Sequence, residues 1–214
     1  MRFLPSRTDR AAFGKIADEY DLVYFGTVDP RVDTDYQIVR GLTLSTDVRD
    51  ENYTTGNVYD YEVAFLQRSR KVVNRSGHKF DRTWTMLQIQ LKVMSVPHFL
   101  VDGRSRSREY GSVLASTQRW QEINWQHFSH THFSELFATY TRPEYATMVG
   151  SLLNPEIQSM LAGHFSEFDY EFCDDKLIIY ATNADINLQV LDHMLRVGLW
   201  LARQLDEPPQ VPQQ

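Results

Sequence analysis

The stretch from Phe133 to Glu207 decides the fold: FSELFATYTRPEYATMVGSLLNPEIQSMLAGHFSEFDYEFCDDKLIIYATNADINLQVLDHMLRVGLWLARQLDE. Pro143 suits the first turn of a helix that runs to about residue 153. Asn154 followed by Pro155 is a strong helix start, with Asn as the N-terminal cap, and Gly163 is predicted to end this second segment. The sequence therefore predicts helical structure over 143–163.

The second half of the stretch predicts a tight hairpin and a closing helix. Segments 168–173 and 177–181 are strand-like and flank the polar pair Asp174-Asp175. Residues 185–205 then follow a helical period, with a broad apolar stripe comprising Ile186, Leu188, Leu191, Met194, Leu195, Leu199 and Leu205. We expect Leu191, Leu195 and Trp200 to lie in the core beneath a sheet.

Upstream of this stretch, alternating apolar residues predict an antiparallel sheet. Residues 58–73 and 80–96 form two long alternating runs around a short polar turn, which is typical of a hairpin. A helix is expected near residues 9–20 and strands at 22–28 and 36–46, whereas the polar segment 47–52 is expected to be a loop. Both faces of 80–96 carry large side chains, so the pattern leaves open which face is buried.

Together these elements predict an α+β fold: a mostly antiparallel sheet with a long hairpin over 58–96, covered on one face by the C-terminal helices. At 214 residues the chain is long enough to bury a core. We expect a single domain over 1–207, which divides into two lobes near 102–112 if it divides at all. The tail at 208–214 is expected to be disordered.

Composition and charge exclude some classes of function. The formal net charge of −6 argues against a general nucleic-acid binder, because neutralising phosphates requires a basic surface. A single cysteine, Cys173, excludes an intramolecular disulfide. The N-terminus lacks the apolar core of a signal peptide, and no run of about 18 apolar residues predicts a membrane span. These features favour a cytoplasmic location, either free or at the inner face of the membrane.

Three histidines in WQHFSHTHF form the first candidate site. His127, His130 and His132 are spaced so that imidazoles could share a Zn²⁺ ion, with Glu122 or Glu135 as a fourth ligand. The spacing matches no standard zinc signature, and partly buried histidines in an aromatic-rich segment are the commoner explanation. The pattern keeps open a metal-binding protein or a metal-dependent hydrolase.

Two basic segments form the second candidate. Arg104, Arg106 and Arg108 alternate with serine in a loop, and Arg68, Arg70, Lys71 and Arg75 form another cluster. Such arginines can contact phosphate, anionic lipid head groups or RNA, although a solvated loop is the commoner structure for such a segment.

The acidic residues and the cysteine of the C-terminal hairpin are weaker candidates for a functional site. Glu167, Asp169 and Glu171 alternate with aromatic residues, which predicts the solvated face of a hairpin strand rather than a catalytic or Ca²⁺-binding cluster. Two aspartates follow Cys173 directly and disfavour a thiolate nucleophile. Neither a phosphate-binding loop nor a serine-nucleophile motif occurs in the sequence.

Four segments resemble an uncharacterised family of bacterial proteins, catalogued as a domain of unknown function: YDYEVAFLQRSR (59–70), LQIQLKVMSVPHFLVDGR (87–104), FSELFATYT (133–141) and residues 152–180 ending FDYEFCDDKLIIY. Members of that family are often tethered to the membrane by adjoining hydrophobic segments. The resemblance implies an α+β fold and argues mildly against an enzyme. The family has no established activity, so no catalytic residue carries over to this chain. The leading hypothesis is therefore a non-enzymatic binding or scaffold domain with a protein partner or an anionic membrane surface.

Overall fold

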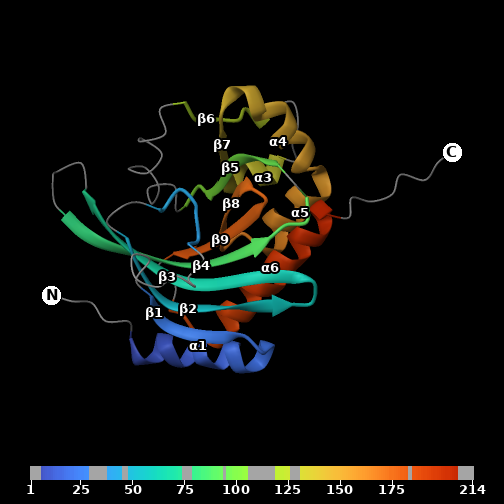
Figure 1. Ribbon diagram of the computed structural model, residues 1–214. Coiled ribbons are helices and arrows are strands. Elements are labelled where there is room, and N and C mark those ends of the chain that lie inside the picture. Colours follow the sequence, from blue (N-terminus) through green and yellow to red (C-terminus); the bar gives the residue numbers. More distant parts are fainter. Residues whose placement is uncertain are drawn as a thin grey trace.

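A computed structural model describes residues 6–28, 38–44, 48–73, 79–93, 95–105, 119–125, 131–182 and 185–206. Within them, strands from the whole length of the chain join one antiparallel sheet, in the order β1-β2-β3-β4-β9-β8-β5-β7-β6 (Figure 1). The strands are β1 (Val23–Val28), β2 (Arg49–Val58), β3 (Tyr61–Val73), β4 (Lys79–Gln90), β5 (Val96–Gly103), β6 (Gln121–Glu122), β7 (Phe137–Thr141), β8 (Asp169–Asp174) and β9 (Lys176–Thr182).

The helices are α1 (Arg7–Tyr20), α3 (Thr131–Leu136), α4 (Ala146–Leu152), α5 (Pro155–His164) and α6 (Leu188–Asp206), with a 3-10 turn at Pro143–Tyr145. The predicted α+β fold with a mostly antiparallel sheet and a long hairpin is confirmed. The helical segments predicted over 143–163 and 185–205 are also present. Asn154 caps α5 as predicted, because its side chain accepts a hydrogen bond from the Ile157 amide at 3.0 Å. Gly163 does not end α5, which continues to His164.

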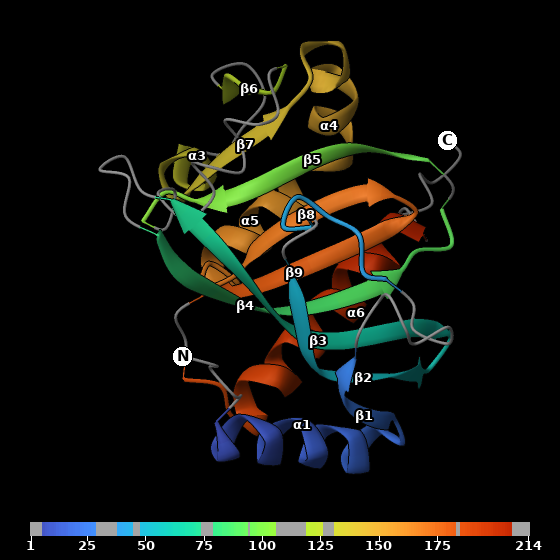
Figure 2. The ribbon, with the colours of Figure 1, turned by 60° about the vertical axis from the view of Figure 1, so that its left-hand side comes forward.

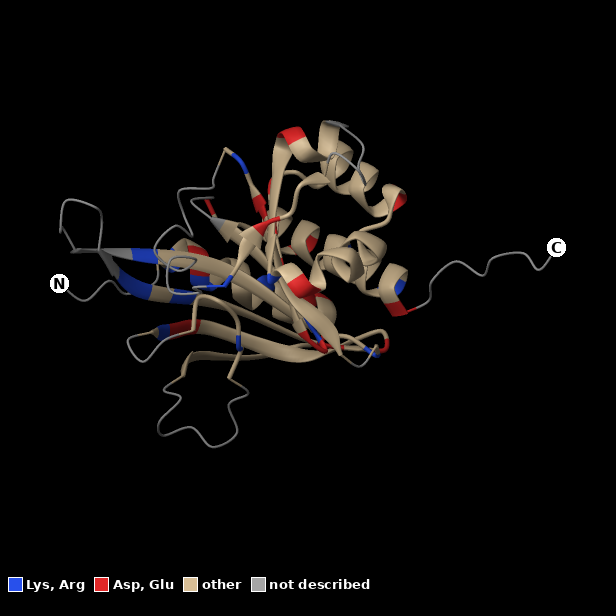
Figure 3. Cartoon of the chain, turned by 90° about the horizontal axis from the view of Figure 1, so that it is seen from above, with Lys and Arg blue, Asp and Glu red and all other residues tan. Residues whose placement is uncertain are grey.

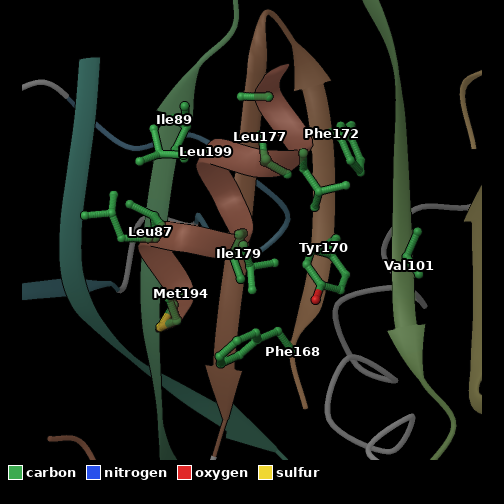
Figure 4. Packing of buried hydrophobic residues seen from close by; sticks show 14 of the residues in the cluster. Leu87, Ile89, Val101, Phe168, Tyr170, Phe172, Leu177, Ile179, Met194 and Leu199 are labelled. Carbon is green, nitrogen blue, oxygen red and sulfur yellow. The ribbon is translucent and has the colours of Figure 1, made fainter. Parts of the chain in front are cut away.

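The helices cover one face of the sheet, here called the helix face. Helix α6 lies across β4 and β9, and its Met194 and Leu199 point toward Leu87, Ile89 and Ile179 (Figure 4). Phe168, Tyr170, Phe172 and Leu177 extend the same apolar layer along the hairpin of β8 and β9. Leu191 and Leu195 are buried as predicted, whereas Trp200 is partly exposed at the margin of the core.

Close approach between α6 and the sheet depends on Gly198. A Cβ atom at this position would lie 2.5 Å from Ile89 Cδ1, which is closer than carbon atoms pack, and a tight 3.1 Å from Ile179 Cδ1. Helix α1 contacts α6 as well as β1 and β2, and the Tyr20 hydroxyl donates to Asp192 Oδ1 at 2.5 Å. The helix face is therefore sealed by direct contact of apolar side chains with the sheet.

Three predictions for the N-terminal third were wrong or shifted. The segment 47–52 was expected to be a loop, but from Arg49 onward it forms the first part of β2. The strand expected over 36–46 does not form in its described part, 38–44, which contains a bend and a turn instead. The strand expected over 58–73 is interrupted at Tyr59 and Asp60, where the chain turns between β2 and β3. Tyr59 is consequently in this turn and is 73% exposed.

Candidate functional site

The segment 38–44 (IVRGLTL), here called the strap, lies across the face of the sheet that is opposite the helices. Figure 2 shows it in blue in front of β4, β8 and β9, with α6 behind the sheet. Val39, Leu42 and Thr43 are buried, whereas Ile38, Arg40 and Leu44 are exposed. Beneath the strap a second apolar cluster contains Leu66, Trp84, Met86, Leu100, Ile178 and Tyr180. We call this side of the sheet the strap face.

A fully buried ion pair holds one end of the strap. Arg68 of β3 donates from Nε and Nη2 to the two carboxylate oxygens of Asp50 on β2, each at 2.7 Å. The same Nη2 donates to the Val39 carbonyl at 2.7 Å. Removing two charges from water is costly, and a bidentate ion pair with further hydrogen bonds is the arrangement that best offsets this cost. Arg68 is therefore a strap anchor and not part of a phosphate-binding surface, which corrects the sequence-based grouping of this residue.

A buried carboxylate holds the middle of the strap. Glu171 of β8 is fully buried, and its oxygens accept the Leu42 amide at 2.8 and 3.0 Å. The hydroxyl of Tyr180 donates to Glu171 Oε2, and His98 Nε2 lies 2.5 Å from Oε1. Asp169, two residues earlier, is also fully buried and accepts the Gly103 amide at 2.9 Å. The prediction that these acidic residues form a solvated face was wrong, because the strap face is itself buried here.

Protonation of His98 follows from its neighbours. Burial lowers the pKa of the imidazole, but hydrogen bonds to Cys173 and Glu171, together with the Glu171 charge, outweigh burial and raise the pKa to about 9. At neutral pH His98 is consequently an imidazolium paired with a carboxylate. Burial, reinforced by the charge and hydrogen bond of Glu171, raises the pKa of Tyr180 well above its ordinary value, so Tyr180 remains a neutral donor.

Gly41 allows the strap to lie this close to the polar cluster. A Cβ atom there would lie 2.9 Å from the Tyr180 hydroxyl, 2.9 Å from Ile178 Cδ1 and 3.0 Å from Glu171 Oε2. A larger residue would require these side chains or the strap to shift, which would disturb the carboxylate that holds the Leu42 amide. No local sequence pattern indicates this contact, because Glu171, Ile178 and Tyr180 are distant from Gly41 in the chain.

Where the strap face reaches solvent, it presents an aromatic surface, here called the aromatic edge: His98, Trp120 and Tyr140. The His98 ring meets the Trp120 ring edge-on, with centroids 4.7 Å apart, and the His98 side chain is 36% exposed. Trp120 and Tyr140 are partly buried against the apolar cluster beneath the strap. Arg104 and Glu122 pair nearby, with Nη2 2.5 Å from Oε1.

Chemically, the arrangement suits binding better than proton transfer. A general base must be neutral at the working pH, whereas His98 is protonated there and its Nε2 is already committed to Glu171. The thiol of Cys173 is partly buried, and its sulfur lies 3.8 Å from Asp174 Oδ2. Sequence reasoning did not single out His98, because its partners come from a different hairpin.

The histidines predicted to bind zinc are only partly described. His132 is in the first turn of α3 with its Nδ1 3.7 Å from Glu135 Oε2, and both side chains are largely exposed. His127 and His130 lie outside the described residues. Among the described residues, no group of three or more histidine, cysteine, aspartate or glutamate side chains is arranged to hold a metal ion. The predicted three-histidine zinc site stays a prediction, which metal analysis of untagged protein and of a His130→Ala variant would test.

The arginines predicted to contact anions are likewise partly described. Arg104 donates from Nε to the Ser134 carbonyl at 2.7 Å, in addition to its ion pair with Glu122. Arg106 and Arg108 lie outside the described residues, as does the tail at 208–214. The anion-binding role of these three arginines stays a prediction.

A shallow, open pocket lies where α6 begins, lined by Glu167, Phe168, Ala181, Asn187, Gln189, Val190 and His193. His193 Nε2 is 2.7 Å from Glu167 Oε1, but both side chains are over 40% exposed, so water screens the pair. Asn187 is engaged as a helix cap, accepting the Val190 amide at 3.0 Å. This pocket offers a weaker case for a site than the aromatic edge.

Comparisons with known proteins identify a shared fold. No protein-family model and no curated protein matches the chain. Among solved structures, the chain is similar to the crystal structure of the mycobacterial trehalose monomycolate transport factor A, TtfA, with a TM-score of 0.58 and 11% sequence identity over 97% of this chain and 100% of that one. At this identity the likeness shows the fold alone. In the described part of the chain, none of the helices combines the length and apolar character that a membrane crossing requires.

Proposed function

We propose that this chain is a non-enzymatic binding domain whose aromatic edge docks a protein partner. The observation that carries the proposal is the state of the polar groups on the strap face. Arg68 and Glu171 direct their hydrogen-bonding atoms to other groups of the chain, and His98 stays protonated at neutral pH. These groups build a rigid surface and do not provide an available base or nucleophile.

The aromatic edge has the composition of a protein-binding surface. Tryptophan, tyrosine and arginine are enriched at the residues that dominate binding energy, especially where they are partly buried against a rigid support. Trp120 and Tyr140 pack on the cluster beneath the strap, and Trp120 also packs against His98. These supports hold the rings in place before a partner arrives, which lowers the entropic cost of binding.

A cytoplasmic location, free or at the inner face of the membrane, fits the same proposal. TtfA is named as a factor that serves transport, and its fold is shared by this chain. An accessory role beside other proteins is therefore our preferred interpretation over catalysis. The resemblance to a bacterial family with membrane-tethered members points in the same direction.

Affinity capture from the native cell with matched aromatic variants tests the proposal. Trp120→Ala and Tyr140→Ala should each lose a partner that the wild-type chain retains reproducibly. Tyr59→Ala removes a ring that is 73% exposed in the turn between β2 and β3 and should retain that partner. If circular dichroism shows that Trp120→Ala and Tyr140→Ala are folded and both still retain the partner, the aromatic edge is not the docking surface.

A further inference from the structure

The pocket where α6 begins has a largely apolar lining that includes aromatic rings. Of the residues that line it, Phe168 and Ala181 are buried and Val190 is half-buried. The His193 ring lies beside the Phe168 ring, with centroids 5.5 Å apart and an angle of 38° between the planes. Figure 4 shows Phe168 at one end of the apolar layer between α6 and the sheet. The pocket therefore offers a ligand apolar surfaces that rest on the buried core.

The size of the pocket suits a small ligand. Its volume is about 320 Å³, which is at the lower end of the range for sites that bind small molecules. The pocket opens to solvent, since the side chains of Glu167 and His193 at its wall are 49% and 41% exposed. A ligand much larger than one ring would leave most of its surface in water. We therefore expect a compact ligand that binds weakly and reversibly.

The polar groups of the lining select a ligand that donates hydrogen bonds. A carboxylate can accept about four hydrogen bonds, and the contact of Glu167 with His193 Nε2, at 2.7 Å, occupies only part of that capacity. Asn187 is engaged on both sides, since its Oδ1 accepts the Val190 amide and its Nδ2 donates to the Asp185 carbonyl at 3.3 Å. The remaining capacity is mainly that of the Glu167 carboxylate, which is an acceptor.

The charge around the pocket favours a cation. Its described lining includes the Glu167 carboxylate and neither lysine nor arginine. In the segment 131–175, acidic residues far outnumber basic ones, since Arg142 is the only lysine or arginine there. Figure 3 shows mainly red segments among the helices, whereas blue segments gather on the strands that project from the other side. The positive end of α6 opposes a cation with about half an elementary charge, but the carboxylate carries a full charge that a ligand can contact directly.

We propose that this pocket binds a small primary amine with an aromatic body. The ammonium group of the ligand contacts Glu167, and its ring packs on Phe168 and Val190. The pocket lies beside α6, on the helix face of the sheet, whereas the aromatic edge belongs to the strap face. The amine site therefore stands or falls independently of the protein-binding role.

Titration of the labelled full chain with phenethylamine at neutral pH, followed by amide chemical shifts in NMR, tests the proposal. Shifts at Ala181 and Val190 should saturate with a Kd of about 1 mM, which is typical of so small a ligand. Two matched compounds separate the contributions of charge and ring. 3-Phenylpropionate carries a carboxylate in place of the ammonium group, and ethylamine lacks the ring. Each should bind at least about tenfold more weakly than phenethylamine.

A charge-removing variant with a matched control locates the amine. Glu167→Gln keeps the shape of the side chain but removes its charge, and should lower the affinity for phenethylamine about tenfold. Glu19→Gln removes the same charge from an exposed position on α1 and should bind as the wild type does. The Trp120→Ala variant should also bind the amine normally, which separates failure of this proposal from failure of the protein-binding proposal.

Three results would overturn the proposal. The first is the absence of saturable shifts at Ala181 and Val190, including the case in which the shifts saturate only elsewhere in the chain. The second is equal affinity for phenethylamine and 3-phenylpropionate, which would mean that the charge of the ligand is not recognised. The third is equal affinity of Glu167→Gln and Glu19→Gln for phenethylamine, with circular dichroism showing both variants folded.

Discussion

The two faces of the sheet are both buried, but by different physical means. The helix face is covered by α1, α4, α5 and α6 through apolar contact, and the close approach of α6 at Gly198 is its tightest point. The strap face is covered by seven described residues, 38–44, held by ionised groups that are themselves buried. Apolar side chains can repack after a small change at low cost, whereas a buried charge that loses its partner has neither a counter-charge nor water to stabilise it. The strap face should therefore be the more sensitive to single changes in polarity.

The largest effect is expected at Arg68. Arg68→Met removes the partner of Asp50 and the donor to the Val39 carbonyl, leaving a carboxylate buried without its counter-charge. We expect a loss of about 3–5 kcal/mol in the free energy of unfolding, measured by urea titration. Arg70→Met, two residues along β3 at a partly exposed position, is the control and should change stability by less than about 1 kcal/mol. Similar losses for both variants would mean that the buried pair does not hold the strap.

An intermediate effect is expected on the helix face at Gly198. Gly198→Ala places a methyl group against Ile89 and Ile179, so these side chains must repack or α6 must move outward, at a cost of about 1–3 kcal/mol. Gly163→Ala in α5 meets nothing within 4 Å and should be neutral or stabilising, because alanine favours helix. Thermal unfolding of the two variants compares them directly. Equal melting temperatures would show that α6 does not pack on β4 as described.

The smallest effect is a pH dependence of the strap face. The folded pKa of His98 is about 9, above its ordinary 6.5, so its contribution to stability is complete below about pH 6.5 and is lost as pH rises through 9. His98 is partly exposed, and after allowance for screening by solvent the loss should be about 1 kcal/mol, or roughly 2–4 °C in Tm. His98→Gln should flatten this part of the pH profile. If the variant lost as much stability as the wild type over this pH range, the pH dependence would come from groups other than His98.

The helix face could be predicted from sequence because its signals are local. The 3.6-residue stripe of α6, the Asn154-Pro155 start of α5 and the Asp174-Asp175 turn each lie within a short window. The alternation of residues 80–96 predicted β4, which ends earlier, at Gln90, and the large side chains on both of its faces left open which side would be covered. The structure resolves that ambiguity, since both sides are buried.

The strap face could not be predicted because its compensating groups are far apart in sequence. Asp50 and Asn52 are 1% exposed, yet in sequence they are part of a polar run typical of a loop. Only pairing with β3 brings Asp50 under Arg68, and only the neighbouring hairpin brings Glu171 to Leu42. Alternation of acidic and aromatic residues in β8 correctly predicts a strand, but it cannot distinguish a solvated acidic face from one buried under a strap.

Amide hydrogen exchange within the strap shows whether buried charges fix it to the sheet. The Leu42 amide donates to the buried carboxylate of Glu171, whereas the Leu44 amide donates to Gly41 in an exposed turn. Measured by NMR on labelled protein, the Leu42 amide should exchange about a hundredfold or more slowly than the Leu44 amide. Fast and equal exchange at the two amides would mean that the strap opens freely and that the buried charges do not fix it to the sheet.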